Sequence, residues 1–161
     1  MNKLLLILFS IVLVYSCKQN DKEIQKNLKN FEAKVEKSLK QLKAELTSEG
    51  FQTFDYIDET TNDTILMQQY FMAFLKKGPN RSQTKKEADS LQKLHLAHLG
   101  KMYDLGYADI SGPFADDGVI RGITIYNVPT QEMADSLANS DPMVKTGRLV
   151  VEIHPWWAAK G

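Results

Sequence analysis

Residues 69–75 read Gln-Tyr-Phe-Met-Ala-Phe-Leu, and this stretch decides the fold. From Tyr70 to Leu75, the residues that would point to either face of a strand are apolar. A strand with one solvated face instead alternates apolar and polar residues. We therefore expect a β-strand that is buried on both sides. Gly78-Pro79 ends this strand, because proline has no N–H to donate to a neighbouring strand.

A helix is predicted directly after this strand. Thr84 and Glu87 have the spacing of a capping box, in which each side chain accepts a hydrogen bond from the other residue's backbone. Apolar residues then recur with the period of a helix until Gly106, a residue type that commonly ends one. The members of this stripe are Leu91, Leu94, His98, Met102 and Leu105.

Three further strands and a second helix complete the predicted domain. The strands are expected at Tyr107–Ser111, Val119–Val128 and Leu149–Ile153, and the helix at Thr130–Asn139. Asp116-Asp117-Gly118 has the residue types of a turn between the first two of these strands. The resulting order, β-α-β-β-α-β, is that of the ferredoxin-like α+β fold.

The predicted sheet has one face that the helices leave bare. Both helices of this arrangement cover the same face of the four-stranded sheet. Because the strands are apolar at both parities, a solvated second face would expose a large apolar patch. A face-to-face homodimer covers such a face, and we expect one.

The N-terminus has the pattern of an export signal, with Lys3 ahead of an apolar stretch at 4–15. A helix of that length reaches about 18 Å, well short of a hydrocarbon core of roughly 30 Å. Val14-Tyr15-Ser16-Cys17 resembles the lipobox of bacterial lipoproteins. The resemblance implies that residues 1–16 are removed and that Cys17 is acylated. It also implies a membrane-anchored protein of the cell envelope, in the outer membrane, facing the periplasm or the cell surface. The alternative is a plain secretory signal with an incidental cysteine.

Two segments separate this signal from the predicted domain at 68–161. Residues 17–46 contain no glycine or proline, and their apolar residues follow steps of three and four. We expect a helical stalk, which either lies on the following domain or pairs with a second copy of itself. Residues 47–67 carry several acids and no Lys or Arg. We expect an acidic linker there, with room for one short extended segment.

Three motifs lie on the predicted elements. They are His95-Leu96-Ala97-His98-Leu99 ahead of Gly106, Ser111-Gly112-Pro113-Phe114, and Ser140-Asp141-Pro142 followed by Gly147. In order and spacing, these motifs make residues 69–157 resemble the YCII-related family of the dimeric α/β-barrel superfamily. The resemblance implies a ferredoxin-like protomer, a barrel-forming homodimer and an active site built on a histidine and an aspartate, here His95 and Asp141. Related members of the superfamily include lactone isomerases and dehydrochlorinases, which need one general base, so no cofactor is expected.

His95 and Asp141 each have two interpretations from the residues alone. An imidazole can accept or release a proton near neutral pH, and a carboxylate on its far nitrogen would fix the tautomer. The same histidine can be a hydrogen-bonded structural group at the edge of the sheet. Asp141 before Pro142 is typical of a helix N-cap, which is compatible with pairing because a carboxylate has two oxygens.

Other polar residues of the predicted cleft are interpreted by residue type. Ser111 is a candidate hydrogen-bond donor to a substrate. Arg121 is either an anchor for an anionic substrate or a solvated charge at the sheet edge. His98 lies three residues after His95, but a third metal ligand is not apparent, so no metal site is expected.

Two classes of function fit these residues. The leading hypothesis is a membrane-anchored lipoprotein whose domain transfers a proton on a small organic molecule, with His95 as the base and Asp141 orienting it. The alternative is a non-catalytic small-molecule-binding or accessory module of the cell envelope. The chain has 20 basic and 20 acidic residues, which leaves no net charge to attract nucleic acid. Nucleic acid is therefore not expected as a partner.

Overall fold

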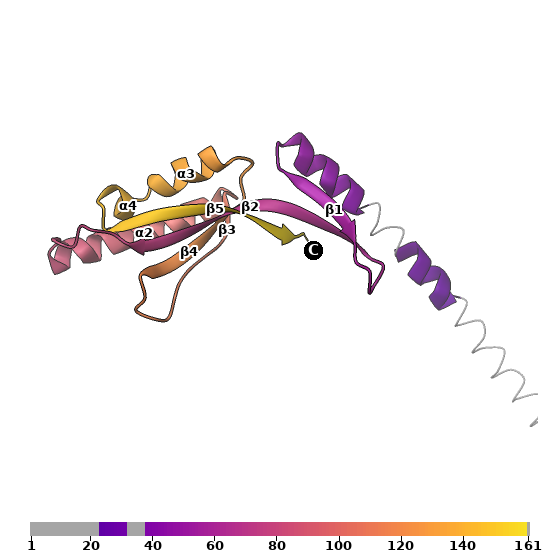
Figure 1. Ribbon diagram of the computed structural model, residues 1–161, viewed down its shortest axis with the longest axis horizontal. Coiled ribbons are helices and arrows are strands. Elements are labelled where there is room, and N and C mark those ends of the chain that lie inside the picture. Colours follow the sequence, from indigo (N-terminus) through magenta and orange to yellow (C-terminus); the bar gives the residue numbers. More distant parts are fainter. Residues whose placement is uncertain (1–22, 32–37, 161) are drawn as a thin grey trace, which may run out of the picture. The chain divides into compact units, whose positions relative to one another are not determined.

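The computed structural model describes residues 23–31 and 38–160 (Figure 1). The predicted signal sequence and Cys17 lie outside these residues, and the stalk is described only in part, as helix at 23–31 and at 38–48. The chain divides into two compact units, Met1–Lys43 and Ala44–Gly161. Within the described residues, no helix has both the length and the apolar character needed to cross a membrane.

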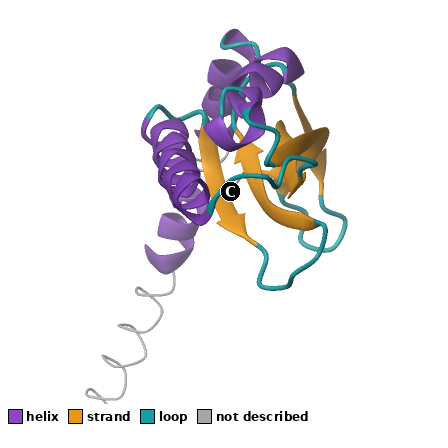
Figure 2. Ribbon diagram, turned by 90° about the vertical axis from the view of Figure 1, so that its left-hand side faces the viewer, coloured by secondary structure: helices purple, strands orange, loops and turns teal. Residues whose placement is uncertain are grey.

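The second unit follows the predicted order of elements. Figure 2 shows its strands as one twisted sheet with helices outside it. The strand–helix–strand–strand–helix–strand order runs from β2 to β5, and a short extra helix, α4, follows α3. The elements are β1 (Thr53–Ile57), β2 (Thr64–Lys77), α2 (Lys85–Asp104), β3 (Ala108–Pro113), β4 (Ile120–Tyr126), α3 (Gln131–Asn139), α4 (Pro142–Lys145) and β5 (Leu149–Ala159).

The long strand β2 is the centre of the sheet. It pairs with β5 from Met67 to Lys77 and with β4 from Phe71 to Lys76, so these two strands lie along its opposite edges. β1 pairs with β2 from Thr64 to Gln68. Because β5 pairs with Met67 and Gln68 on one edge of β2, β1 lies on the opposite edge, the same edge as β4. β3 pairs with β4, and every pairing is antiparallel. The order β5-β2-β4-β3 is that of a ferredoxin-like sheet.

The segment 47–67 differs from the predicted acidic linker. Its expected extended segment exists as β1, but this strand and the start of β2 both belong to the sheet. β2 therefore extends beyond the predicted 69–75 in both directions, and β5 continues past Ile153 to Ala159. Apolar residues marked the buried centre of each strand, whereas the strand ends depend on pairing partners that are distant in sequence.

Local capping signals predicted the helix boundaries correctly. The Thr84 side chain accepts from the backbone N–H of Glu87 at 3.3 Å, and the Glu87 carboxylate accepts from the backbone N–H of Thr84 at 2.7 Å. Gly106 follows α2 with φ at 71°, a left-handed conformation that costs glycine little. Thr130, where the second helix was predicted to start, is the N-cap of α3. Each boundary is set within a few residues of sequence, which explains why it was predictable.

The helices α2, α3 and α4 cover one face of the sheet. On β2 this face carries Phe71, Ala73 and Leu75, all of which are buried. Phe71 and Ala73 belong to one core cluster with Met102 of α2 and residues of α3, and Leu75 belongs to a second cluster with Met143 of α4. The core thus lies between the helices and this face of β2.

The opposite face of the sheet presents apolar side chains to solvent. Met72 and Phe74 are only half-buried, although they lie on the central strand. Ile110 of β3 is 58% exposed and Val150 of β5 is 40% exposed. The apolar residues at both parities of β2 therefore reflect one face covered by helices and one face left open by them.

Candidate functional site

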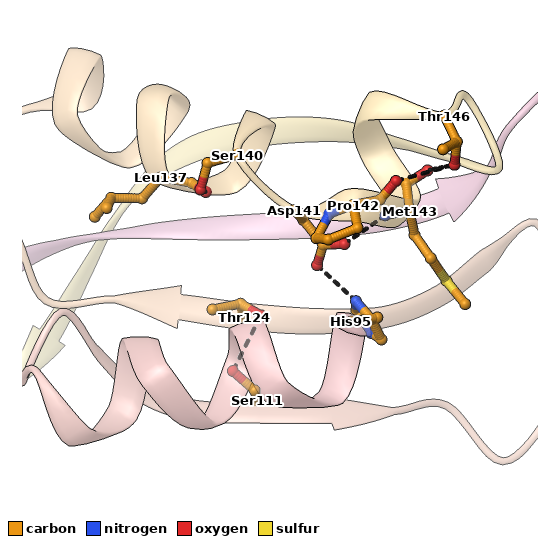
Figure 3. Close-up of polar contacts among 9 residues, drawn as sticks. All are labelled: His95, Ser111, Thr124, Leu137, Ser140, Asp141, Pro142, Met143 and Thr146. Carbon is orange, nitrogen blue, oxygen red and sulfur yellow. Dashed lines mark hydrogen bonds and ion pairs between the residues drawn. The ribbon is translucent and has the colours of Figure 1, made fainter. Parts of the chain in front are cut away.

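A buried histidine and a buried aspartate meet between α2 and α4 (Figure 3). Nδ1 of His95 lies 2.6 Å from Oδ2 of Asp141, and the two residues are 8% and 2% exposed. An ionised carboxylate can only accept, so Nδ1 carries the hydrogen and donates it. In the neutral imidazole, the free lone pair is then on Nε2, which can act as a base.

The cap of α4 holds the Asp141 carboxylate in place. Its Oδ1 accepts from the backbone N–H of Met143 at 2.8 Å, and Pro142 occupies the first turn of the helix. The second oxygen, Oδ2, is therefore available for His95. Both roles suggested by the sequence, capping and pairing, occur in the same carboxylate.

A cavity of about 280 Å³ opens beside His95, with walls from α2, β3 and β4. Most of its surface residues are apolar, and its polar side chains come from Gln92, His95, Ser111 and Arg121. The full set of lining residues is Leu75, Gln92, His95, Leu96, Leu99, Ser111, Gly112, Pro113, Arg121, Gly122, Ile123, Met143 and Leu149. An apolar pocket with a few convergent polar groups is the usual form of a small-molecule site.

The structure brings three of the predicted site residues together at this cavity: His95, Ser111 and Arg121. The Ser111 hydroxyl donates to Oγ1 of Thr124 at 3.1 Å. The Arg121 guanidinium contacts Oδ1 of Asp117 at 3.2 Å. Asp141 itself does not line the cavity and acts on it through His95.

Gln92, which is not among the predicted site residues, precedes His95 by one turn of α2 and lines the same cavity. Its spacing from His95 could have indicated it, because residues three apart share a helix face.

Burial raises the pKa of Tyr126 far above its usual value, and the nearby Asp141 carboxylate adds to that shift. Tyr126 therefore keeps its proton and adds no negative charge beside the pair.

His98 lies one turn after His95 and is half-buried. Its Nε2 is buried without a hydrogen-bond partner. Burial lowers the pKa of His98 below its usual value, and the Asp141 charge opposes this shift only in part. In 23–31 and 38–160, no cluster of three or more His, Cys, Asp or Glu side chains could hold a metal ion.

Comparisons with known proteins bear on the domain that carries this site. Residues 69–157 match the model of the YCII-related domain, a range that contains all three sequence motifs. No curated protein sequence matches the chain. Among solved structures, the chain is similar to a 5-chloro-2-hydroxyhydroquinone dehydrochlorinase from Burkholderia phenoliruptrix AC1100, in complex with 2,5-dihydroxybenzoquinone. The identity is 18% and the TM-score 0.43, over 54% of this chain and 92% of that one.

Two substitutions of Asp141 separate its capping role from its pairing role. Asp141→Ala is expected to lower the free energy of unfolding by about 3 kcal/mol, because the α4 cap is lost and the buried Nδ1–H of His95 loses its acceptor. Asp141→Asn keeps an oxygen for the cap and turns an NH2 group toward His95. It is expected to cost less stability but to move the imidazole hydrogen from Nδ1 to Nε2.

Urea denaturation measures the stabilities of both variants, and the ¹⁵N chemical shifts of the imidazole report the tautomer of His95. An Asp141→Asn protein that kept the hydrogen on Nδ1 would contradict this account of the pair.

Proposed function

The chain belongs to the YCII-related domain family, and from this premise we propose that its cavity processes a small organic molecule by proton transfer, with His95 as the general base. The observation that carries the proposal is the 2.6 Å bond between His95 Nδ1 and Asp141 Oδ2 at the wall of the cavity. The bond leaves Nε2 as the basic nitrogen, and the carboxylate stabilises the imidazolium that forms when Nε2 takes a proton.

The reaction is a proton transfer at carbon. Nε2 of His95 takes a proton from a carbon next to a carbonyl group, and the electron pair of the C–H bond passes into the substrate. Return of the proton to another atom gives an isomer, whereas departure of a leaving group gives an elimination. The Ser111 hydroxyl, which now donates to Thr124, can turn to donate to a substrate oxygen. These steps require no cofactor.

Hydrogen exchange tests this function before the substrate is known. A thermal-shift screen of small molecules first identifies ligands of the wild type and of His95→Gln. Each ligand is then kept in D2O with either protein while ¹H NMR follows the loss of its acidic C–H signal. The wild type is expected to exchange this hydrogen at least about 100-fold faster than His95→Gln, because a positioned base contributes that much.

Asp141→Asn is the matched control, since its His95 is expected to carry the hydrogen on Nε2 and to be inactive as a base. Equal exchange rates in the wild type and in both variants would rule out His95 as the base.

A non-catalytic binding module of the cell envelope is the second candidate. The observation that favours it is the capping bond from Met143 to Asp141, which gives the aspartate a structural role independent of catalysis. The same experiment separates the two functions. Ligands that bind the wild type and His95→Gln alike, with no exchange in either, would support the binding module.

The open sheet face supports a homodimer as the working form. Ile110 on this face and Leu94 on α2 are exposed to similar extents, 58% and 52%. Ile110→Glu is expected to give a monomer in sedimentation velocity, because burying a carboxylate in an apolar interface is costly. Leu94→Glu, on the helical side, is the control and is expected to remain dimeric. A wild-type monomer at tens of micromolar would contradict the proposal.

The lipobox pattern supports attachment to the membrane through Cys17, and with it a place in the cell envelope, in the outer membrane. The wild type is expected to incorporate a radioactive fatty acid and to sediment with membranes. Cys17→Ala is expected to lose the label, because the lipid would be attached through the cysteine sulfur. A Cys17→Ala protein that still carried the label in the membrane fraction would show that the anchor lies elsewhere.

A further inference from the structure

Arg121 contributes a permanent positive charge to the wall of the cavity, and its acidic partner, Asp117, does not line the cavity. Among the cavity-lining residues in the described part of the chain, Arg121 is the one with a permanent charge, and none is acidic. The Asp141 carboxylate, which holds His95, does not line the cavity. It is buried and already accepts two hydrogen bonds. The field within the cavity therefore favours an anion.

Arg121 lies at a β-bulge beside the cavity. Leu75 pairs with Gly122 and Lys76 pairs with Ile120, so Arg121 is the extra residue of β4 with no partner on β2. Bulges change the direction of a side chain and are common next to binding sites. On the other edge of β4, the Arg121 carbonyl still accepts from the N–H of Phe114 at 3.0 Å, which fixes the backbone there.

The present partner of Arg121 is easily replaced. Its Nη1 contacts Oδ1 of Asp117 at 3.2 Å, and the carbonyls of Asp116 and Gly118 at 3.3 and 3.4 Å. All three contacts fall on one nitrogen, and a guanidinium has further N–H donors. The Asp117 side chain is fully exposed, so its ion pair with Arg121 is screened by water and is weak. A carboxylate inside the cavity would be screened less and could bind two nitrogens at once.

We propose that the cavity selects small carboxylates, that Arg121 binds the carboxylate in place of Asp117, and that this contact turns the rest of the molecule toward His95. The orienting role rests on the proposed proton-transfer function, whereas the selection of carboxylates does not. The cavity volume of about 280 Å³ equals that of about nine water molecules at ~30 Å³ each, which suits a ligand of similar atom count.

Benzoate and its neutral analogue benzamide are suitable probes, because they match this size and differ mainly in charge. Isothermal titration calorimetry is expected to show that the wild type binds benzoate about tenfold more tightly than benzamide. Arg121→Gln is expected to abolish this preference. Asp117→Asn is expected to tighten benzoate binding about threefold, because the internal competitor loses its charge.

Arg148→Gln is the matched control. Arg148 contacts the side chain of Gln83 at 3.0 Å and does not line the cavity, so its removal is expected to leave the preference unchanged. Equal affinities of the wild type for the two probes, or no binding of benzoate at millimolar concentration, would overturn the proposal. A preference that survived in Arg121→Gln would do the same.

His95→Gln keeps this result separate from the test of proton transfer. It is expected to retain the benzoate preference while losing hydrogen exchange. Loss of the preference in His95→Gln would show that the histidine, and not Arg121, recognises the anion. A wild type that exchanges ligand hydrogens without preferring benzoate would overturn the carboxylate assignment and leave the proton-transfer function intact.

Discussion

The hydrogen bonds along both edges of β2 hold the domain together. On one edge of β2, residues Met67 to Lys77 pair with β5. On the other edge, β1 and then β4 pair with successive parts of β2. An unpaired N–H or C=O in this central position would be costly, so each neighbouring strand has to keep its register. The helices then pack on the face that carries Phe71, Ala73 and Leu75, and this packing brings α2 and α4 together.

The candidate site follows from that placement of the helices. α2 carries His95 and the N-terminus of α4 carries Asp141, and their bond joins two helices that meet above the same end of the sheet. The carboxylate satisfies two buried donors, the imidazole Nδ1–H and the backbone N–H of Met143. One residue therefore both caps α4 and holds the His95 imidazole, and a substitution has to be chosen with care to separate the two roles.

The two proposals for the cavity rest on three of its physical features. Apolar walls lower the local dielectric, which strengthens charge interactions inside it. In the proposed function His95 is the base, held by its bond to Asp141, and Arg121 of β4 contributes a positive charge. The base and the charge come from α2 and from the bulge of β4, so their separation is set by the packing of the helix on the sheet. A ligand held at Arg121 would be oriented relative to His95 without any contact from Asp141.

Local sequence determined the element order and most helix boundaries of this protein. The capping residues Thr84, Thr130 and Asp141 and the helix-ending Gly106 act within a few positions, so the chemistry of a short stretch was sufficient. The family resemblance implied the pairing of His95 with Asp141, and the residue types alone were compatible with either a catalytic or a structural role.

Tertiary structure alone decided which of these residues meet and how far the sheet extends. The pairing of β1 with β2 drew part of the predicted linker into the sheet, and no local pattern marks such a partner. The place of Arg121 in a β-bulge depends on a register shift between Leu75 and Lys76, which arises from the fit of two whole strands. Hydrogen bonds such as that of His95 to Asp141 join residues far apart in sequence, and their geometry exists only once the helices have packed.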